Sequence, residues 1–361
     1  MGDRRPRLMI VGPGELHDPD LEVMGEQLVA HFGDAWQQEH EATVAVVGRM
    51  LGCEHPPYLI PGSGTAALDA ALLNLFEPGQ RVVIPDTGFF GNRLLEIAAA
   101  HRLDVFRLEV EIGEPVDPAV VADAAAKHRA AGVVLCHVDT SVATRNPIRE
   151  IAEAARSEGA ITVVDGIASV GGEPCEVDGF GLAALVTATQ KGLESPPGLA
   201  ILALGPEGVA RVAARSQRPH TFYLDLQVWD RYRKEWPHHP HPVTMPANIV
   251  KATRSSVERI LAQGLGATIE AKHALAAKVR AGLDELGLRP VARADAQAGM
   301  IVAAYAEEAN RIVGGVLERG IMIAGGLAPL AGRAIRVGVM GKTANEEMVE
   351  ATLAAIRETL A

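Results

Sequence analysis

The sequence predicts an α/β protein with a mainly parallel sheet covered by helices on both faces. Between residues 56 and 205, six short apolar runs alternate with longer amphipathic or alanine-rich stretches. The short runs are apolar at successive positions, which is typical of strands buried on both faces. The chain has 361 residues, of which 48% are hydrophobic and only 4% aromatic, and glycine is abundant. That length and composition favour two domains whose helices pack through small side chains.

The elements follow from these runs in chain order. The expected strands are residues 81–85, 105–110, 132–136, 160–164, 184–187 and 199–203, and the expected helices between them include 64–76, 91–102, 117–130 and 147–158. Residues 217–245 hold many of the aromatic residues and several prolines, which predicts an irregular excursion over the surface or toward a partner subunit. A long helical pattern covers 246–287, and the chain then alternates again, with strands at 300–304 and 334–340 and helices near 306–319 and 344–360.

These patterns divide the chain into three parts. We expect an N-terminal segment over 1–17, a large domain over 18–263 and a smaller C-terminal α/β domain over 264–361.

Charge and composition exclude several classes of function. The formal net charge is −11 and the arginines are scattered, so no basic field is available for nucleic acid or acidic lipid. The N-terminal apolar stretch is too short for a signal peptide, and no run approaches the roughly 18 apolar residues that span a bilayer. The three cysteines are far apart and lack a C-x-x-C spacing, which argues against a disulfide framework or a cysteine zinc site. We therefore expect a cytoplasmic protein without a membrane or nucleic-acid partner.

Two charged residues follow neighbouring predicted strands. Lys191 lies after the strand 184–187 and before a Pro-Pro-Gly turn, whereas the other six lysines lie in polar or helical surroundings that suggest solvated side chains. Asp165 ends the apolar strand 160–164, and acids at the carboxyl ends of parallel strands face the crevice in which such sheets bind ligands. A buried lysine with a lowered pKa suits Schiff-base chemistry, and a carboxylate opposite it suits a pyridinium nitrogen.

A glycine-rich turn precedes the first predicted helix of the sheet region. Pro61-Gly62-Ser63-Gly64-Thr65 would place backbone N–H groups and two hydroxyls around a phosphate. The alternative is a dinucleotide site, because Gly62-x-Gly64-x-x-Ala67 partly matches a Rossmann fingerprint and Asp86 follows the next strand. That alternative gives Lys191 and Asp165 no role, so the phosphate cradle is favoured.

Together, these motifs resemble the class V, fold-type I pyridoxal-phosphate (PLP) aminotransferases, nearest to the alanine–glyoxylate (serine–pyruvate) branch. The resemblance extends over nearly the whole chain. Its most specific stretches are Pro61-Gly-Ser-Gly-Thr-Ala-Ala-Leu68, Val164-Asp-Gly-Ile-Ala-Ser-Val-Gly-Gly172, Gln190-Lys-Gly-Leu-Glu-Ser-Pro-Pro-Gly198 and Arg336-Val-Gly-Val-Met-Gly341.

The resemblance implies a role for each of ten residues. Lys191 would hold the cofactor as a Schiff base and move the substrate Cα proton, and Asp165 would bind the pyridinium nitrogen. The other cofactor contacts would come from Ser63, Gly64, Thr65, Gln190, Thr140 near the ring, Phe90 stacked on the ring, and Thr244 reaching across a homodimer interface to the partner's phosphate. Arg336 would bind the substrate α-carboxylate through two parallel hydrogen bonds.

Some positions depart from the family pattern. Ala143 and Arg145 stand where the family has glycine and an aliphatic residue, His241 stands where it often has tyrosine, and Asp34 replaces histidine in a Gly-His-Arg stretch. Arg145 or His241 could read a second polar group of the substrate, or they could be an ordinary surface arginine and loop histidine. The run His238-His239-Pro240-His241 lacks helical ligand spacing, so no metal site is expected.

The resemblance implies transfer of an amino group from a small amino acid to a small 2-oxo acid such as glyoxylate or pyruvate. The alternatives are another PLP reaction on the same fold, such as a lyase, aldolase or desulfurase reaction, a non-catalytic protein of PLP-enzyme fold, and a NAD-dependent oxidoreductase. Retention of Lys191, Asp165 and Arg336 together argues against the non-catalytic reading.

Overall fold

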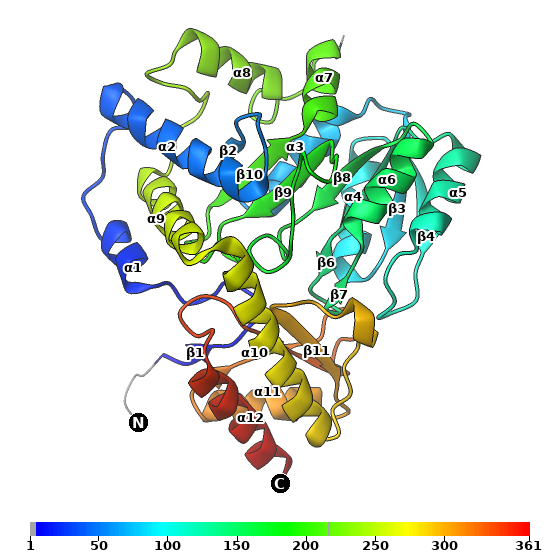
Figure 1. The fold of residues 1–361 in the computed structure, drawn as a ribbon, viewed down its shortest axis with the longest axis vertical. Helices are drawn as coiled ribbons and strands as arrows, with labels where there is room; N and C mark the ends of the chain where they lie inside the picture. The colour runs from blue at the N-terminus through cyan, green and yellow to red at the C-terminus, as the bar shows by residue number, and fades with distance from the viewer. Residues whose placement is uncertain (1–4, 216) are drawn as a thin grey trace.

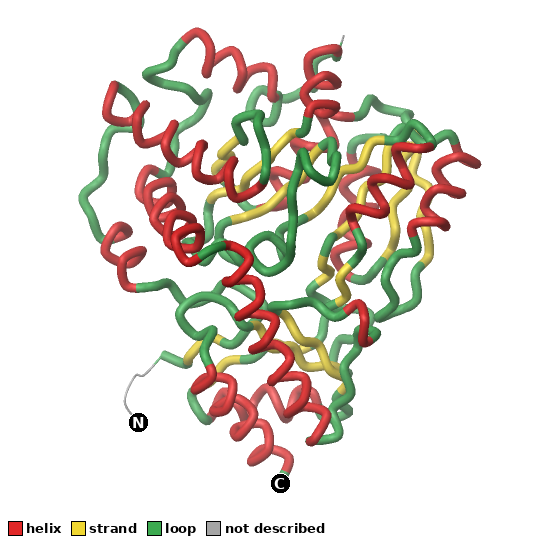
Figure 2. The backbone as a smooth tube through the Cα atoms, in the orientation of Figure 1, coloured by secondary structure: helices red, strands yellow, loops and turns green. Residues whose placement is uncertain are grey.

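A seven-stranded sheet forms the centre of the large domain. The computed structural model describes residues 5–215 and 217–361 and is shown in Figures 1 and 2. Across the sheet the strands run β2 (Tyr58–Pro61), β10 (Leu199–Leu204), β9 (Ala184–Ala188), β8 (Ile161–Asp165), β5 (Gly132–Cys136), β3 (Arg81–Asp86) and β4 (Asp104–Glu109). The five strands from β9 to β4 are parallel, and β10 is antiparallel to both of its neighbours.

Helices cover both faces of this sheet because successive strand residues are apolar. In β5, Val133 and Leu135 join one apolar cluster, while Val134 and Cys136 join another on the opposite face. The first cluster includes side chains of α2 (Asp34–Leu51), α5 (Pro118–His128), α6 (Ile148–Ser157) and α9 (Ala247–Gln263), and the second includes side chains of α3 (Gly64–Leu75), α4 (Phe89–Ala100), α7 (Pro206–Ala214) and α8 (Leu226–Glu235). The sheet is therefore buried on both faces.

A smaller C-terminal unit lies below the large sheet in Figure 1. Its sheet has the order β11 (Ile301–Tyr305), β14 (Ala334–Gly338), β13 (Ala324–Gly325), and it packs with α10 (Leu265–Glu285), α11 (Ala309–Glu318) and α12 (Glu346–Leu360). The N-terminal strand β1 (Arg7–Leu8) pairs with β12 (Ile321–Met322), and Met9 and Val11 belong to the small unit's core. The N-terminal segment thus crosses between the two units before α1 (Asp18–Met24).

The structure confirms the α/β class and all six expected strands between residues 81 and 203, each within one or two residues of the predicted bounds. Two expectations were wrong. Residues 217–245 are not wholly irregular, because α8 forms there after the side chain of Asp225 caps its first turn by accepting from the N–H of Gln227. The helical pattern over 246–287 is two helices, since Gly264 adopts φ +87° between α9 and α10.

The sequence also left several elements unassigned. They are the strands β1, β2, β12 and β13, the helices α1, α2 and α7, the ribbon of β6 (Val138–Asp139) and β7 (Thr144–Arg145), and the short 3-10 helix η1 (Ala294–Ala296). The boundary we propose between the domains, at 263/264, lies at the turn between α9 and α10. Among residues 5–215 and 217–361, none of the helices combines the length and hydropathy that a membrane crossing requires.

Candidate active site

A cavity of about 210 Å³ opens at the carboxyl ends of the parallel strands. Eight of the ten residues predicted from the sequence line it: Ser63, Gly64, Thr65, Phe90, Thr140, Asp165, Gln190 and Lys191. They come from β8, from the loops after β6 and β9, and from the starts of α3 and α4. The cavity therefore lies where open parallel sheets bind ligands.

Lys191 enters the cavity from the loop that follows β9. Its Nζ donates to the carbonyl oxygen of Val11 at 2.5 Å, so the N-terminal segment closes one side of the site. Burial and the positive charge of Arg336 together lower the pKa of Lys191 to about 8, while Asp165 acts in the opposite direction. The amine is therefore partly neutral near physiological pH, as nucleophilic and proton-transfer chemistry requires.

Asp165 is the last residue of β8 and is 6% exposed. Its Oδ1 accepts from the N–H of Ile167 at 2.9 Å, and among the residues that the structure describes its Oδ2 has only the thiol of Cys136 as a partner, at 3.8 Å. Burial raises the pKa of Asp165 to about 6, against the backbone hydrogen bond, which lowers it. A carboxylate held this way has one oxygen available for a cationic N–H donor.

The glycine-rich turn places the start of α3 at the cavity. Ser63 occupies the N-cap position, but its side chain makes no capping hydrogen bond. The N–H of Ala66 donates to the carbonyl oxygen of Ser63 at 2.8 Å, and among the described residues the N–H groups of Gly64 and Thr65 remain open. A Cβ on Gly64 would lie 2.3 Å from Cδ1 of Ile167, so any larger residue there would have to displace the Ile167 side chain. Together with the hydroxyls of Ser63 and Thr65, these groups suit a phosphate.

Two buried polar atoms in the cavity wall have no hydrogen-bond partner in the described residues. They are Oγ1 of Thr140 and Oε1 of Gln190. An unmet buried polar group costs about 1–3 kcal/mol, so such atoms usually face a ligand or ordered water. A ring with polar substituents and a phosphate, such as PLP, would supply partners for both atoms, for Asp165 and for the α3 N-terminus.

The position of Phe90 depends on a residue that the sequence did not single out. Oδ2 of Asp139 accepts from the N–H groups of Phe90 and Gly91, both at 3.0 Å, and so caps the start of α4. Arg93 lies one turn further along, 4.8 Å from the ring centre of Phe90, and also lines the cavity. The sequence could have indicated Arg93, because it lies three residues after Phe90 and residues at this spacing share a helix face.

The two remaining predicted residues do not line the cavity. Arg336, on β14, is 6% exposed and donates to the carbonyl oxygens of Gly325 at 2.8 Å and Thr140 at 3.1 Å. Its positive charge is one of the causes that lower the pKa of Lys191. Thr244 is exposed in the loop before α9, away from the cavity of its own chain.

The residues that depart from the family pattern also have partners outside this cavity. Arg145 pairs with Glu173 at 3.6 Å and donates to the carbonyl oxygen of Asp295. Asp34 is a surface residue paired with His238. His241 is fully buried: its Nε2 accepts from the indole N–H of Trp36 at 2.8 Å, and its Nδ1 contacts the carbonyl oxygen of Val243 at 2.7 Å.

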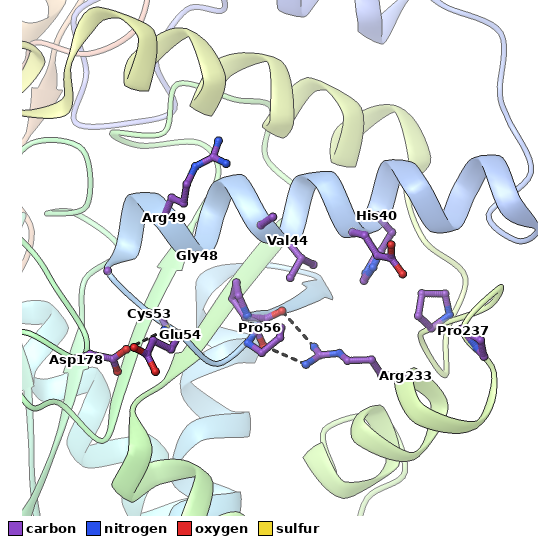
Figure 3. Close-up of a pocket in the computed structure, with 15 residues that line it drawn as sticks. His40, Val44, Gly48, Arg49, Cys53, Glu54, Pro56, Asp178, Arg233 and Pro237 are labelled. Atoms are coloured by element: carbon purple, nitrogen blue, oxygen red, sulfur yellow. Dashed lines mark hydrogen bonds between the residues drawn. The ribbon is translucent and has the colours of Figure 1, made fainter.

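A larger hollow, of about 670 Å³, lies on another part of the surface (Figure 3). It is formed by α2, the turn after it and the end of α8, with Val44, Arg49, Pro56, Arg233 and Pro237 among its lining residues. None of the predicted site residues lines it. In the described ranges, no group of three or more histidine, cysteine, aspartate or glutamate side chains has a geometry that could hold a metal ion.

Comparison with known proteins identifies the family. The profile of the family described as "Aminotransferase class-V" matches residues 22–350, which is most of the chain. The chain belongs to the class V aminotransferases. This family is PLP-dependent, so the polar groups that line the cavity fit the cofactor that the family uses.

The relatives agree with this assignment. An uncharacterised aminotransferase of Methanocaldococcus jannaschii is 32% identical, over 98% of this chain and 92% of its own length. The (S)-ureidoglycine–glyoxylate transaminase of Bacillus subtilis is 30% identical, over 98% and 90%. The crystal structure of an alanine–glyoxylate aminotransferase from Nostoc sp. superposes with a TM-score of 0.95 at 26% identity and covers 100% of this chain and 97% of that one.

Proposed function

We propose that this aminotransferase moves an amino group from a small amino acid to a small 2-oxo acid such as glyoxylate or pyruvate, with PLP bound to Lys191. The observation that carries the proposal is the meeting of the partly buried amine of Lys191 and the buried acid of Asp165 in one cavity, whose wall holds two polar atoms without a partner in the described residues. Glyoxylate is favoured as acceptor because it is named for relatives with different amino donors, ureidoglycine and alanine.

Each site residue would act on a stated atom. Asp165 would hold the proton of the ring nitrogen, the α3 N-terminus with Ser63 and Thr65 would bind the phosphate, and Phe90 would pack against the ring face. When bound, the cofactor supplies an electron sink for the bond to the substrate Cα.

Lys191 and Arg336 would handle the substrate. The guanidinium of Arg336 would pair with the α-carboxylate and so orient the Cα–H bond. The amine of Lys191, once released from the cofactor, would take up the substrate Cα proton and deliver it to a carbon of the cofactor. The lowered pKa of Lys191 suits both proton transfers. Val11, whose carbonyl oxygen accepts from Nζ, would limit where the amine can move.

The test is a panel of amino donors with glyoxylate and pyruvate. In the first half-reaction, a good donor should convert the bound cofactor's visible absorption band to that of the amine form, without release of ammonia. Glyoxylate or pyruvate should then restore the original band. Release of free ammonia or substrate cleavage, with no amine form of the cofactor, would instead support the alternative of a lyase-type reaction on the same fold.

A further inference from the structure

A buried ion pair joins the small unit to the loop that carries Lys191. Glu194 lies three residues after Lys191, is 7% exposed, and its Oε1 lies 2.8 Å from Nζ of Lys272 on α10. Its Oε2 contacts Nη1 of Arg259 on α9 and Nε2 of His17, each at 3.0 Å. Burial acts to raise the pKa of Glu194, but the cations around it hold the pKa well below its usual range.

Lys272 is only 3% exposed, so the sequence-based expectation that it is a solvated lysine was wrong. Besides Glu194, its Nζ donates to the carbonyl oxygens of Gly171 at 2.9 Å and Gly192 at 3.2 Å. The three donors of the ammonium are therefore all used. Gly192 follows Lys191 directly, and Gly171 lies in the loop that follows Asp165.

At this point the two loops touch backbone to backbone. A Cβ on Gly171 would lie 2.3 Å from the carbonyl oxygen of Gly192, and a Cβ on Gly192 would lie 2.1 Å from the carbonyl oxygen of Val170. No side chain can separate the loops, and the ammonium of Lys272 holds both carbonyl oxygens.

We propose that Lys272 and Glu194 are a positioning pair, which fixes the loop of Lys191 against the loop of Asp165 and ties both to the small unit and the N-terminal segment. Neither residue lines the cavity, so neither is a catalytic residue. Their effect acts through the placement of the Lys191 amine in its partly buried position beside Val11. The inference rests on the proposed role of Lys191.

The substitution Glu194→Gln distinguishes a positioning role of Glu194 from a direct effect of its charge on the pKa of Lys191. Removal of a nearby negative charge would by itself lower the pKa of Lys191, because the ammonium loses an attractive partner. Loosening of the loop would admit water and raise the pKa toward that of an ordinary lysine. We expect a rise of about one pH unit.

The double substitution Glu194→Gln with Lys272→Met guards against misfolding, because it leaves no unpaired buried charge. The double variant should show the same rise in the pKa of Lys191. Asp225→Asn is the matched control: Asp225 is also a buried carboxylate paired with an arginine, Arg218, but it contacts neither loop.

The measurement is the pH dependence of trace acetylation at Lys191 in the full-length, cofactor-free chain, followed by mass spectrometry. A rise in the pKa of Lys191 in both variants but not in the control is the expected result. An unchanged or lowered pKa in both variants, or an equal rise in the control, would overturn the inference. Borohydride reduction with PLP, done separately on the unmodified chain, tests the proposed function, so the two failures are distinguishable.

Discussion

Gly12 lies directly against the side chain of Lys191. A Cβ built on Gly12 would come within 2.4 Å of Cδ and 2.7 Å of Nζ of that lysine, and the residue has φ +107°. The glycine is therefore part of the wall that keeps the amine in place.

Gly12→Ala should displace Lys191 and reduce binding of PLP at least about tenfold, since a clash at the reacting atom cannot relax without moving it. Gly33→Ala is the control, because Gly33 also has a positive φ, +88°, but has open space around it. The control should lose stability, by about 1 kcal/mol, without losing cofactor. The measurement is the affinity of each variant for PLP, obtained by titration followed by absorbance. Equal PLP affinity in both variants would contradict the role of Gly12 in keeping the Lys191 amine in place.

Asp165 makes the stability of the cofactor-free chain depend on pH. Its folded-state pKa is raised from 3.8 to about 6, so its contribution is present below about pH 4 and is lost as the pH rises through about 6. Asp165→Asn should match the parent protein near pH 4 and exceed its unfolding free energy by about 3 kcal/mol at pH 7. Urea unfolding at pH 4 and pH 7 measures these free energies. A difference between the two proteins that is the same at both pH values would refute the prediction.

Arg336 is held by two carbonyl oxygens in a fixed orientation. Arg336→Lys should lower kcat/KM for amino acids about 10- to 100-fold, because an ammonium cannot make the two-pronged carboxylate pair. Primary amines without a carboxylate should react no more slowly with the variant than with the parent. If both substrate classes slow equally, Arg336 does not bind the carboxylate.

The buried histidines beside Trp36 should make the protein sensitive to acid. Burial, together with neighbouring histidines, lowers the pKa of His241 to about 4 and that of His40 to about 3. The stability they contribute is full above about pH 6.5 and declines as the pH falls through 4. In thermal unfolding, His241→Gln should make the melting temperature fall less steeply as the pH falls. His220→Gln, a substitution at an exposed histidine, should leave this pH dependence unchanged.

The exposed position of Thr244 fits a site completed by a second copy of the chain. Sedimentation should give a dimer, and Thr244→Ala should weaken PLP binding without changing the dimer's mass. A fully active monomer loaded with PLP would contradict this prediction.

Local signals predicted most of the candidate site residues that line the cavity. Asp165 and Lys191 each follow an apolar strand, and the carboxyl ends of neighbouring parallel strands meet at one edge, so their proximity follows from topology. Gly62 and Gly64 indicated the start of α3 in the sequence.

Contacts across long sequence separations could not be predicted in this way. Asp139 caps α4 from 49 residues away, and Lys272 reaches Gly192 from 80 residues away. An aspartate at the end of a two-residue strand and a lysine in a helix carry no local sign of such partners, which depend on the tertiary arrangement. The split at Gly264 did have a local sign, the glycine itself, but a single glycine is often tolerated within a helix.

The most direct test of the account is covalent capture of the cofactor. The protein should turn yellow with added PLP, and borohydride reduction followed by peptide mapping should place the adduct on Lys191 alone, with no adduct in Lys191→Ala. A colourless protein, or an adduct on another lysine, would contradict the central claim.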